Sequence, residues 1–130
     1  MKYFDLYELV DRATYEKWGE GAWNLLSPDL LYSVDGVRGF FDAACWVNNW
    51  YGGHGSDQYR GYRPDGCTVG APKSEHKKGN AADITIEGID GETARQRILD
   101  NQDHPSLCKI MRMEANVPWL HIDCKRVPNR

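Results

Sequence analysis

Features that this sequence lacks exclude several classes of protein. No apolar run approaches the roughly 18 residues of a membrane-spanning helix. The N-terminal stretch is interrupted by Asp5, Glu8 and Asp11, so it lacks the apolar core of a signal peptide. We therefore expect synthesis in the cytosol without membrane insertion. The 16 Lys and Arg residues are outnumbered by 19 Asp and Glu, and the resulting net charge of -3 provides no positive field for nucleic acid.

Paired cysteines are also missing. The four cysteines are widely spaced, without a C-x-x-C pair, which fits neither a zinc ribbon nor a small disulfide scaffold. We expect reduced, mostly buried thiols. A chain of 130 residues has room for one compact domain, and no internal repeat or linker divides it. Residues 1–130 are therefore predicted to form a single domain, with residues 1–26 as a helical N-terminal extension packed on it.

The pattern of apolar residues predicts a mixed α+β domain. Its two helical stripes are Phe4, Tyr7, Val10 and Ala13, and Leu30, Val34, Val37 and Phe41. The second helix begins at the capping residue Ser27, with Pro28 in its first position, although Gly36 and Gly39 lower its intrinsic stability by about 1 kcal/mol each. A third helix is expected over residues 92–100, and strands over residues 44–50, 82–87, 107–114 and 119–125.

A long glycine-rich segment, residues 51–73, has no apolar periodicity. Long loops in small domains usually carry function or are disordered. We expect this segment to form a mobile rim over a binding groove. His54, which lies within it, is expected to face solvent, with contact to a substrate as the alternative.

Residues suited to metal binding follow this segment. The first group has the pattern Ser74-x-His76-x-x-Gly79-x-Ala81-x-Asp83, and the second Glu114-x-x-x-x-Trp119-x-His121-x-Asp123. Alternation along residues 82–87 directs Asp83 away from the core, which Ile84 and Ile86 enter. A catalytic zinc ion takes three protein ligands of nitrogen and carboxylate type and leaves one position open. His76, Asp83 and His121 supply such a set, so we expect one Zn²⁺ per chain.

Together the two groups resemble the motifs of the zinc D-Ala-D-Ala carboxypeptidase family. This family includes bacterial and bacteriophage murein peptidases and the hedgehog signalling domain. The sequence RGYRP is similar to its Gly-Tyr-Arg element, and the similarity runs from about Leu30 to Arg126. The segment between Arg63 and Ser74 is shorter than in many relatives, and NNWYGGHG with the helical N-terminus looks like a bacteriophage-type variant. The resemblance implies a hedgehog/DD-peptidase-like α+β fold, with a small antiparallel sheet and flanking helices.

The resemblance also implies roles for individual side chains. Glu114 matches the carboxylate that transfers protons, with a salt bridge at a strand end as the structural alternative and Asp123 as the competing base. Arg63 would bind a substrate carboxylate or a developing oxyanion, and Arg60 is the alternative for this role. Asp123 is otherwise expected to orient a ligand histidine.

Two further residues are candidates for contact with substrate. Ser74 lies in the first motif, where a hydrogen bond to the loop backbone is favoured over direct contact with substrate. Trp119 lies in the second motif, where packing in the core is the alternative to forming a pocket wall.

The function implied by the resemblance is a zinc metallopeptidase acting on peptidoglycan stem peptides, as an endolysin or a virion lysis factor. It would cut the L-Ala-D-Glu bond or a bond involving D-alanine, and the sequence does not choose between them. Access to the wall would need a membrane-permeabilising holin or delivery in a virion, and a monomer is expected. A metal-containing binding module of the same fold, without turnover, is the alternative. A nucleic-acid-binding role rests only on aromatic content and conflicts with the charge balance.

Overall fold

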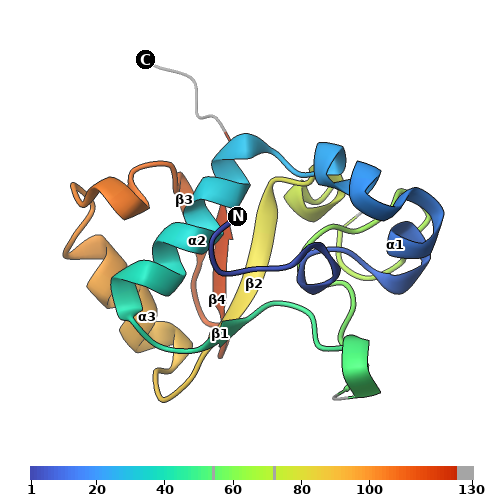
Figure 1. The fold of residues 1–130 in the computed structure, drawn as a ribbon. Coiled ribbons are helices and arrows are strands. Elements are labelled where there is room, and N and C mark those ends of the chain that lie inside the picture. The colour runs from blue at the N-terminus through green and yellow to red at the C-terminus, as the bar shows by residue number, and fades with distance from the viewer. Residues whose placement is uncertain (54, 72, 126–130) are drawn as a thin grey trace.

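The computed structural model describes residues 1–53, 55–71 and 73–125, and the described chain forms an α+β fold (Figure 1). Its four-stranded antiparallel sheet has the order β1-β2-β4-β3. The strands are β1 (Cys45–Trp46), β2 (Ala81–Ile86), β3 (Arg112–Glu114) and β4 (Leu120–Asp123), and the α-helices are α1 (Arg12–Trp18), α2 (Pro28–Phe41) and α3 (Gly91–Leu99). In the described ranges no helix has both the length and the apolar character needed to cross a membrane.

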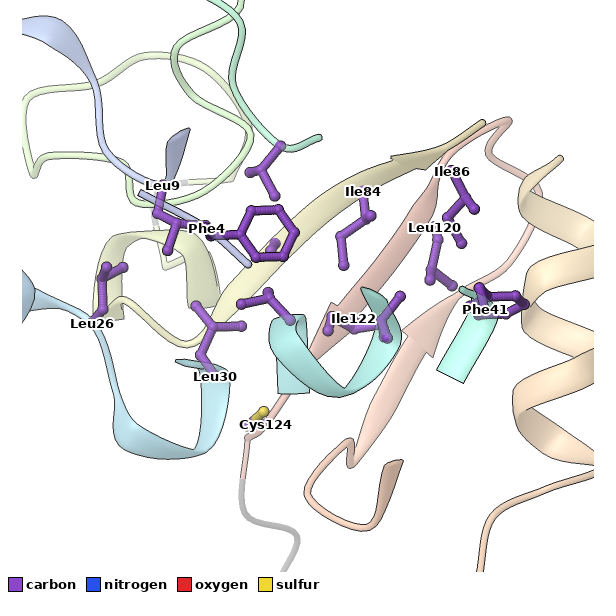
Figure 2. Packing of buried hydrophobic residues seen from close by; sticks show 14 of the residues in the cluster. Phe4, Leu9, Leu26, Leu30, Phe41, Ile84, Ile86, Leu120, Ile122 and Cys124 are labelled. Atoms are coloured by element: carbon purple, nitrogen blue, oxygen red, sulfur yellow. The ribbon is translucent and has the colours of Figure 1, made fainter. Parts of the chain in front are cut away.

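The core lies between α2 and one face of the sheet (Figure 2). Ser27 caps α2 by accepting a hydrogen bond from the Leu30 backbone N–H, and the predicted apolar stripe of this helix is buried. Ile84 and Ile122 meet this stripe from β2 and β4. Because side chains alternate along a strand, Asp83 on β2 points to the opposite face. The site residues therefore occupy the face of the sheet that α2 does not cover.

The N-terminal segment packs on this core, but the prediction of one amphipathic helix is wrong. It forms a 3₁₀ turn (Leu6–Glu8), α1 and a second 3₁₀ segment (Gly19–Leu25). The break occurs because Asp11 caps α1, its carboxylate accepting a hydrogen bond from the Thr14 N–H at 3.0 Å. Phe4 and Val10 are buried, whereas Ala13 is exposed.

Two predicted strands are shorter than expected. The strand predicted over residues 44–50 ends at Trp46 because Asn48 leaves the sheet. The buried Asn48 amide donates a hydrogen bond to the Val10 carbonyl and accepts one from the Arg60 N–H, both at 3.0 Å. The strand predicted over residues 107–114 begins only at Arg112, because a 3₁₀ turn (Pro105–Leu107) and an irregular stretch precede it.

The cysteines follow the prediction only in part. All four are free, as expected. Cys124 is buried, with its sulfur 3.4 Å from the Ser33 hydroxyl. Cys45 and Cys67 are half-buried and Cys108 is exposed, so the prediction of mostly buried thiols is wrong.

Part of the glycine-rich segment is anchored to its surroundings. Arg60 O accepts a hydrogen bond from the Asp83 N–H at 2.7 Å, the Tyr62 N–H donates to Leu9 O at 2.8 Å, and the Arg63 N–H donates to His76 O at 3.1 Å. Residues 60–63 therefore join the N-terminal segment to β2. The prediction of a mobile rim now concerns the described residues outside this stretch, and His54 lies outside the described residues.

Gly79 fixes the turn that carries the first motif. It ends the 3₁₀ segment Glu75–Lys78 with a φ of 66°, and a Cβ here would overlap with the Leu25 carbonyl oxygen. We expect Gly79→Ala to lower the free energy of unfolding by more than the ~1–2 kcal/mol of left-handed strain alone, because the Leu25 backbone must also move. Denaturant titration measures the loss.

Gly88→Ala is the matched control for this prediction. Gly88 has a φ of 76°, yet nothing lies within 4 Å of a Cβ built on it, so only the conformational strain is expected. Equal losses in the two variants would contradict the proposed close packing of Gly79 on Leu25.

Candidate metal centre

The first motif forms a short capped turn that directs His76 toward the sheet. The Ser74 hydroxyl accepts a hydrogen bond from the His76 N–H at 3.2 Å, which begins the turn. The His76 ring is buried, and its Nδ1 lies 2.8 Å from the Gly61 carbonyl oxygen. A carbonyl can only accept, so Nδ1 carries a proton, and Nε2 is the ring nitrogen that would bind a metal ion. This Nε2 lies 3.5 Å from Asp83 Oδ1.

Three side chains form a row across neighbouring strands. The strand register places Asp83 on β2 and Glu114 on β3 on either side of His121 on β4. His121 Nδ1 lies 2.7 Å from Asp83 Oδ1 and 3.8 Å from Glu114 Oε2. Asp83 is buried, whereas the Glu114 side chain is 56% exposed. The row thus runs from a buried carboxylate to one that solvent reaches.

The geometry of His76, Asp83 and His121 is suited to holding a metal ion. One ligand atom from each lies within 4.8 Å of the other two. Two atoms bound to zinc at ~2.1 Å in tetrahedral geometry are roughly 3.4 Å apart, and the separations from Asp83 Oδ1 to the two imidazoles are 2.7 and 3.5 Å. Two imidazole nitrogens and one carboxylate are also the donor types that zinc prefers.

The charges of this group are strongly coupled. Burial alone would raise the pKa of Asp83, but hydrogen bonds from His121 and His76 hold it well below its usual range. Burial alone would lower the pKa of His121, but hydrogen bonds to Asp123 and Asp83 and their negative charges raise it to about 9. In the metal-free protein His121 is therefore an imidazolium between two carboxylates at neutral pH.

Metal binding should depend on pH, because an ion must displace a proton from His121. With a pKa of about 9 in the metal-free protein, His121 binds this proton up to about that pH. We expect the apparent affinity for Zn²⁺ to rise up to about tenfold per pH unit between pH 7.5 and 8.5, with proton release. Competition against a chromophoric chelator, corrected for the chelator's own protonation, measures this rise.

The His121 proton, which opposes metal binding, stabilises the fold of the metal-free protein. The folded-state pKa of His121 is raised, so its ion pairs stabilise the metal-free protein fully below the unfolded pKa near 6.5. That contribution is lost as the pH rises through about 9. A zinc affinity that does not change between pH 7.5 and 8.5 would contradict the assigned protonation of His121.

Asp123 contacts His121 through Nε2, the ring nitrogen that does not face Asp83. The His121 Nε2–H faces Asp123 Oδ2 at 3.4 Å. Arg112 donates two hydrogen bonds to the same carboxylate, at 2.9 and 3.0 Å. Although burial opposes the shift, hydrogen bonds from His121 and Arg112 lower the pKa of Asp123 to about 2. Asp123 is therefore a fixed anion that orients the imidazole, and its bonding leaves it poorly placed to exchange protons with a substrate.

The three candidate ligands line a cavity with a volume of about 420 Å³, and the remaining predicted site residues surround it. Arg63, Ser74, Glu114 and Trp119 all line it together with the three candidate ligands. Arg63 Nη2 lies 3.5 Å from Asp83 Oδ2, and its Nε donates to the Tyr59 carbonyl at 2.7 Å. Trp119 is 37% exposed, so it forms part of the wall and is not packed in the core.

Sequence reasoning missed two supporting groups. One is the Gly61 carbonyl that sets the His76 tautomer, and a backbone acceptor leaves no signal in the sequence. The other is Arg112, which could have been found, because pairing Glu114 with His121 in antiparallel strands also pairs Arg112 with Asp123. Of the histidines outside the candidate group, His104 is exposed, and its Nδ1 accepts a hydrogen bond from the Ser106 N–H.

Comparison of the chain with protein-family models, with curated proteins and with solved structures found no match. The function therefore has to be inferred from the site itself. The site combines a candidate metal group, a partly exposed carboxylate beside it and a guanidinium in contact with a candidate ligand. This combination is suited to hydrolysis of a carbonyl compound.

Proposed function

We propose that this protein is a zinc metallopeptidase of hedgehog/DD-peptidase-like fold that hydrolyses peptide bonds of peptidoglycan stem peptides. The observation that carries the proposal is the buried His76, Asp83 and His121 group with Glu114 opposite His121 in the adjacent strand. The motif resemblance supplies the substrate class. The small cavity also suits a short peptide segment rather than a folded protein.

Zinc and Glu114 would divide the chemistry. A zinc ion held by His76, Asp83 and His121 would polarise the scissile carbonyl and lower the pKa of the attacking water. Glu114 would take the proton from that water and deliver it to the leaving amine. Its position fits this role, because the carboxylate lies 3.8 Å from a candidate ligand and is exposed enough to meet both water and substrate.

Arg63 would stabilise the negative charge that develops on the substrate oxygen. Its guanidinium lines the cavity and is held between Asp83 and the Tyr59 carbonyl. Trp119, which also lines the cavity, would pack against the substrate. Ser74 already uses its hydroxyl to cap the His76 turn, so it would contribute mainly by holding that turn at the edge of the cavity.

The biological setting that fits this activity is lysis of a bacterial cell wall by a bacteriophage. The protein would act as a monomeric endolysin released by a holin, or as a lysis factor delivered in a virion. A second candidate function is a metal-containing binding module without turnover, for which the buried ligand group would suffice. The proton-transfer residue Glu114 favours the enzyme, because a module that only binds has no use for a partly exposed carboxylate beside its metal.

Digestion of purified sacculi tests the proposal. Zinc-loaded protein should release muropeptides with new amino or carboxyl termini, and mass spectrometry identifies the bond that was cut. The metal-free protein should be inactive and should recover activity when zinc is restored. Absence of new termini at confirmed zinc content, together with retained binding to sacculi, would overturn the enzyme in favour of the binding module.

A further inference from the structure

A second cavity, of about 520 Å³, adjoins the candidate metal centre. It shares Arg63, Asp83 and Trp119 with the first cavity and continues along β2 past Thr85. Part of its lining is apolar, contributed by Ile89 and other residues around α3 and the start of β4. A substrate bound at the metal centre therefore has an adjoining space on one side of the bond to be cut.

Arg60 contributes a positively charged side chain to this second cavity. Its backbone is fixed at both ends, because its N–H donates to Asn48 Oδ1 at 3.0 Å and its carbonyl accepts from the Asp83 N–H at 2.7 Å. The side chain is half-buried and lines the cavity. Arg60 is thus held directly beside a candidate metal ligand, but it does not line the cavity that contains the metal group.

The Arg60 guanidinium has no carboxylate within 4.0 Å among the described residues. Asp57 lines the same cavity, but its carboxylate accepts a hydrogen bond from the Asn49 side chain at 3.3 Å. Burial lowers the pKa of Arg60, and the charges of Asp83 and Asp57 offset this only in part. A partly buried cation without a close anion is costly unless a ligand completes the pair.

Arg63 differs from Arg60 in this respect. Its guanidinium is already engaged by the Asp83 carboxylate and by the Tyr59 carbonyl. Its side chain is only 11% exposed. Of the two arginines in the sequence YRGYRP, Arg60 therefore has more of its hydrogen-bonding capacity available to a ligand.

We propose that the second cavity is a specificity subsite, in which Arg60 binds a carboxylate of the substrate while the neighbouring apolar wall packs against the substrate's aliphatic carbons. The occupant is a stem-peptide residue next to the scissile bond that carries a free carboxylate. This inference rests on the proposed function. Charge complementarity supports it, since a guanidinium and a carboxylate form two parallel hydrogen bonds.

Amidated substrates test this proposal. A synthetic stem tetrapeptide is compared with derivatives in each of which one carboxylate is converted to a carboxamide. For the zinc-loaded protein, one of these changes should lower kcat/KM by about 10- to 100-fold, the effect of losing a hydrogen-bonded charge. Arg60→Gln should lower kcat/KM for the carboxylate peptide by a similar factor, leave the amide unchanged and so remove the preference. Arg60→Lys should restore part of it, since a point charge replaces a planar fork.

Binding separates failure of this proposal from failure of the proposed function. Calorimetry measures the binding of the same peptides to zinc-loaded Glu114→Gln protein, with and without Arg60→Gln. An Arg60-dependent carboxylate preference in binding, without hydrolysis by the unaltered protein, would support the subsite and overturn the peptidase. Hydrolysis without a carboxylate preference, or a preference that survives Arg60→Gln, would overturn the subsite and leave the peptidase standing. If the protein neither binds nor hydrolyses these peptides, both the subsite and the peptidase are overturned.

Discussion

The Glu114→Gln protein is expected to fold, to bind zinc like the unaltered protein and to lose turnover by on the order of 10²-fold or more, the usual scale for removing acid–base catalysis. Glutamine keeps the shape of the side chain but cannot accept a proton. The substitution should not disturb the fold, because Glu114 lies at the end of the edge strand β3 and its side chain is 56% exposed. Steady-state kinetics on a purified muropeptide, with zinc content measured in parallel, tests this expectation.

Asp123→Asn provides the matched control for this prediction. Asp123 is buried and paired with Arg112 behind His121, so its loss should weaken zinc binding by about 10- to 100-fold. Turnover at saturating zinc should fall much less than in Glu114→Gln. Near-normal turnover by the zinc-loaded glutamine variant would remove Glu114 from the mechanism and move Asp123 into first place as the base.

Much of the site was predictable because it lies in locally determined structure. Alternation along residues 82–87 directs Asp83 away from the core and Ile84 into it, and in the structure Ile84 belongs to the core cluster whereas Asp83 contacts His121 and His76. Only four residues separate the strands predicted over residues 107–114 and 119–125, and the structure joins these segments in an antiparallel pair that places Glu114 opposite His121. In both cases the signal is local in the sequence, and tertiary contacts reinforce it.

Other elements were not predictable because distant contacts determine them. Asn48 follows β1 and forms hydrogen bonds with Val10 and Arg60. One of these partners lies far before Asn48 in the sequence and the other lies after it. Gly36 was counted against the second helix, yet a Cβ at this position would overlap with the Ser106 carbonyl. The glycine therefore allows the 3₁₀ turn Pro105–Leu107 to pack closely on α2, an advantage that helix propensity does not reveal.

The roles of the two arginines show the same limit. Arg60 and Arg63 lie three residues apart in one loop, and the sequence favoured Arg63 for substrate binding with Arg60 as its alternative. Their environments differ because Asp83 uses its backbone N–H to hold Arg60 and its carboxylate to hold Arg63. Only the structure separates an arginine bound to a candidate ligand from one with its guanidinium directed to a second cavity.

The metal group should be the most sensitive part of the molecule to substitution. His76→Ala and His121→Ala each remove one of three candidate ligands, so we expect both to lose stoichiometric zinc under mild chelation and to lose hydrolysis with it. The loss of affinity should exceed the ~10- to 100-fold that follows from removing a group behind a ligand. His104→Ala is the control, because His104 is exposed and lies outside the candidate group. Stoichiometric zinc in both ligand variants would overturn the assignment.

Asp83→Asn tests the charge of this group separately from its shape. The Asp83 carboxylate lies within 3.5 Å of His76, His121 and Arg63, so it is the shared anion of three potentially cationic neighbours. Asparagine would leave a dication facing two imidazoles and the Arg63 guanidinium without that negative charge, and zinc affinity should fall as in the histidine variants. The metal-free variant should also be destabilised near neutral pH, because the raised pKa of His121 depends in part on Asp83. Metal analysis after chelation measures the loss of zinc, and thermal unfolding of the metal-free form measures the loss of stability. Unchanged zinc content would show that Asp83 is not a ligand.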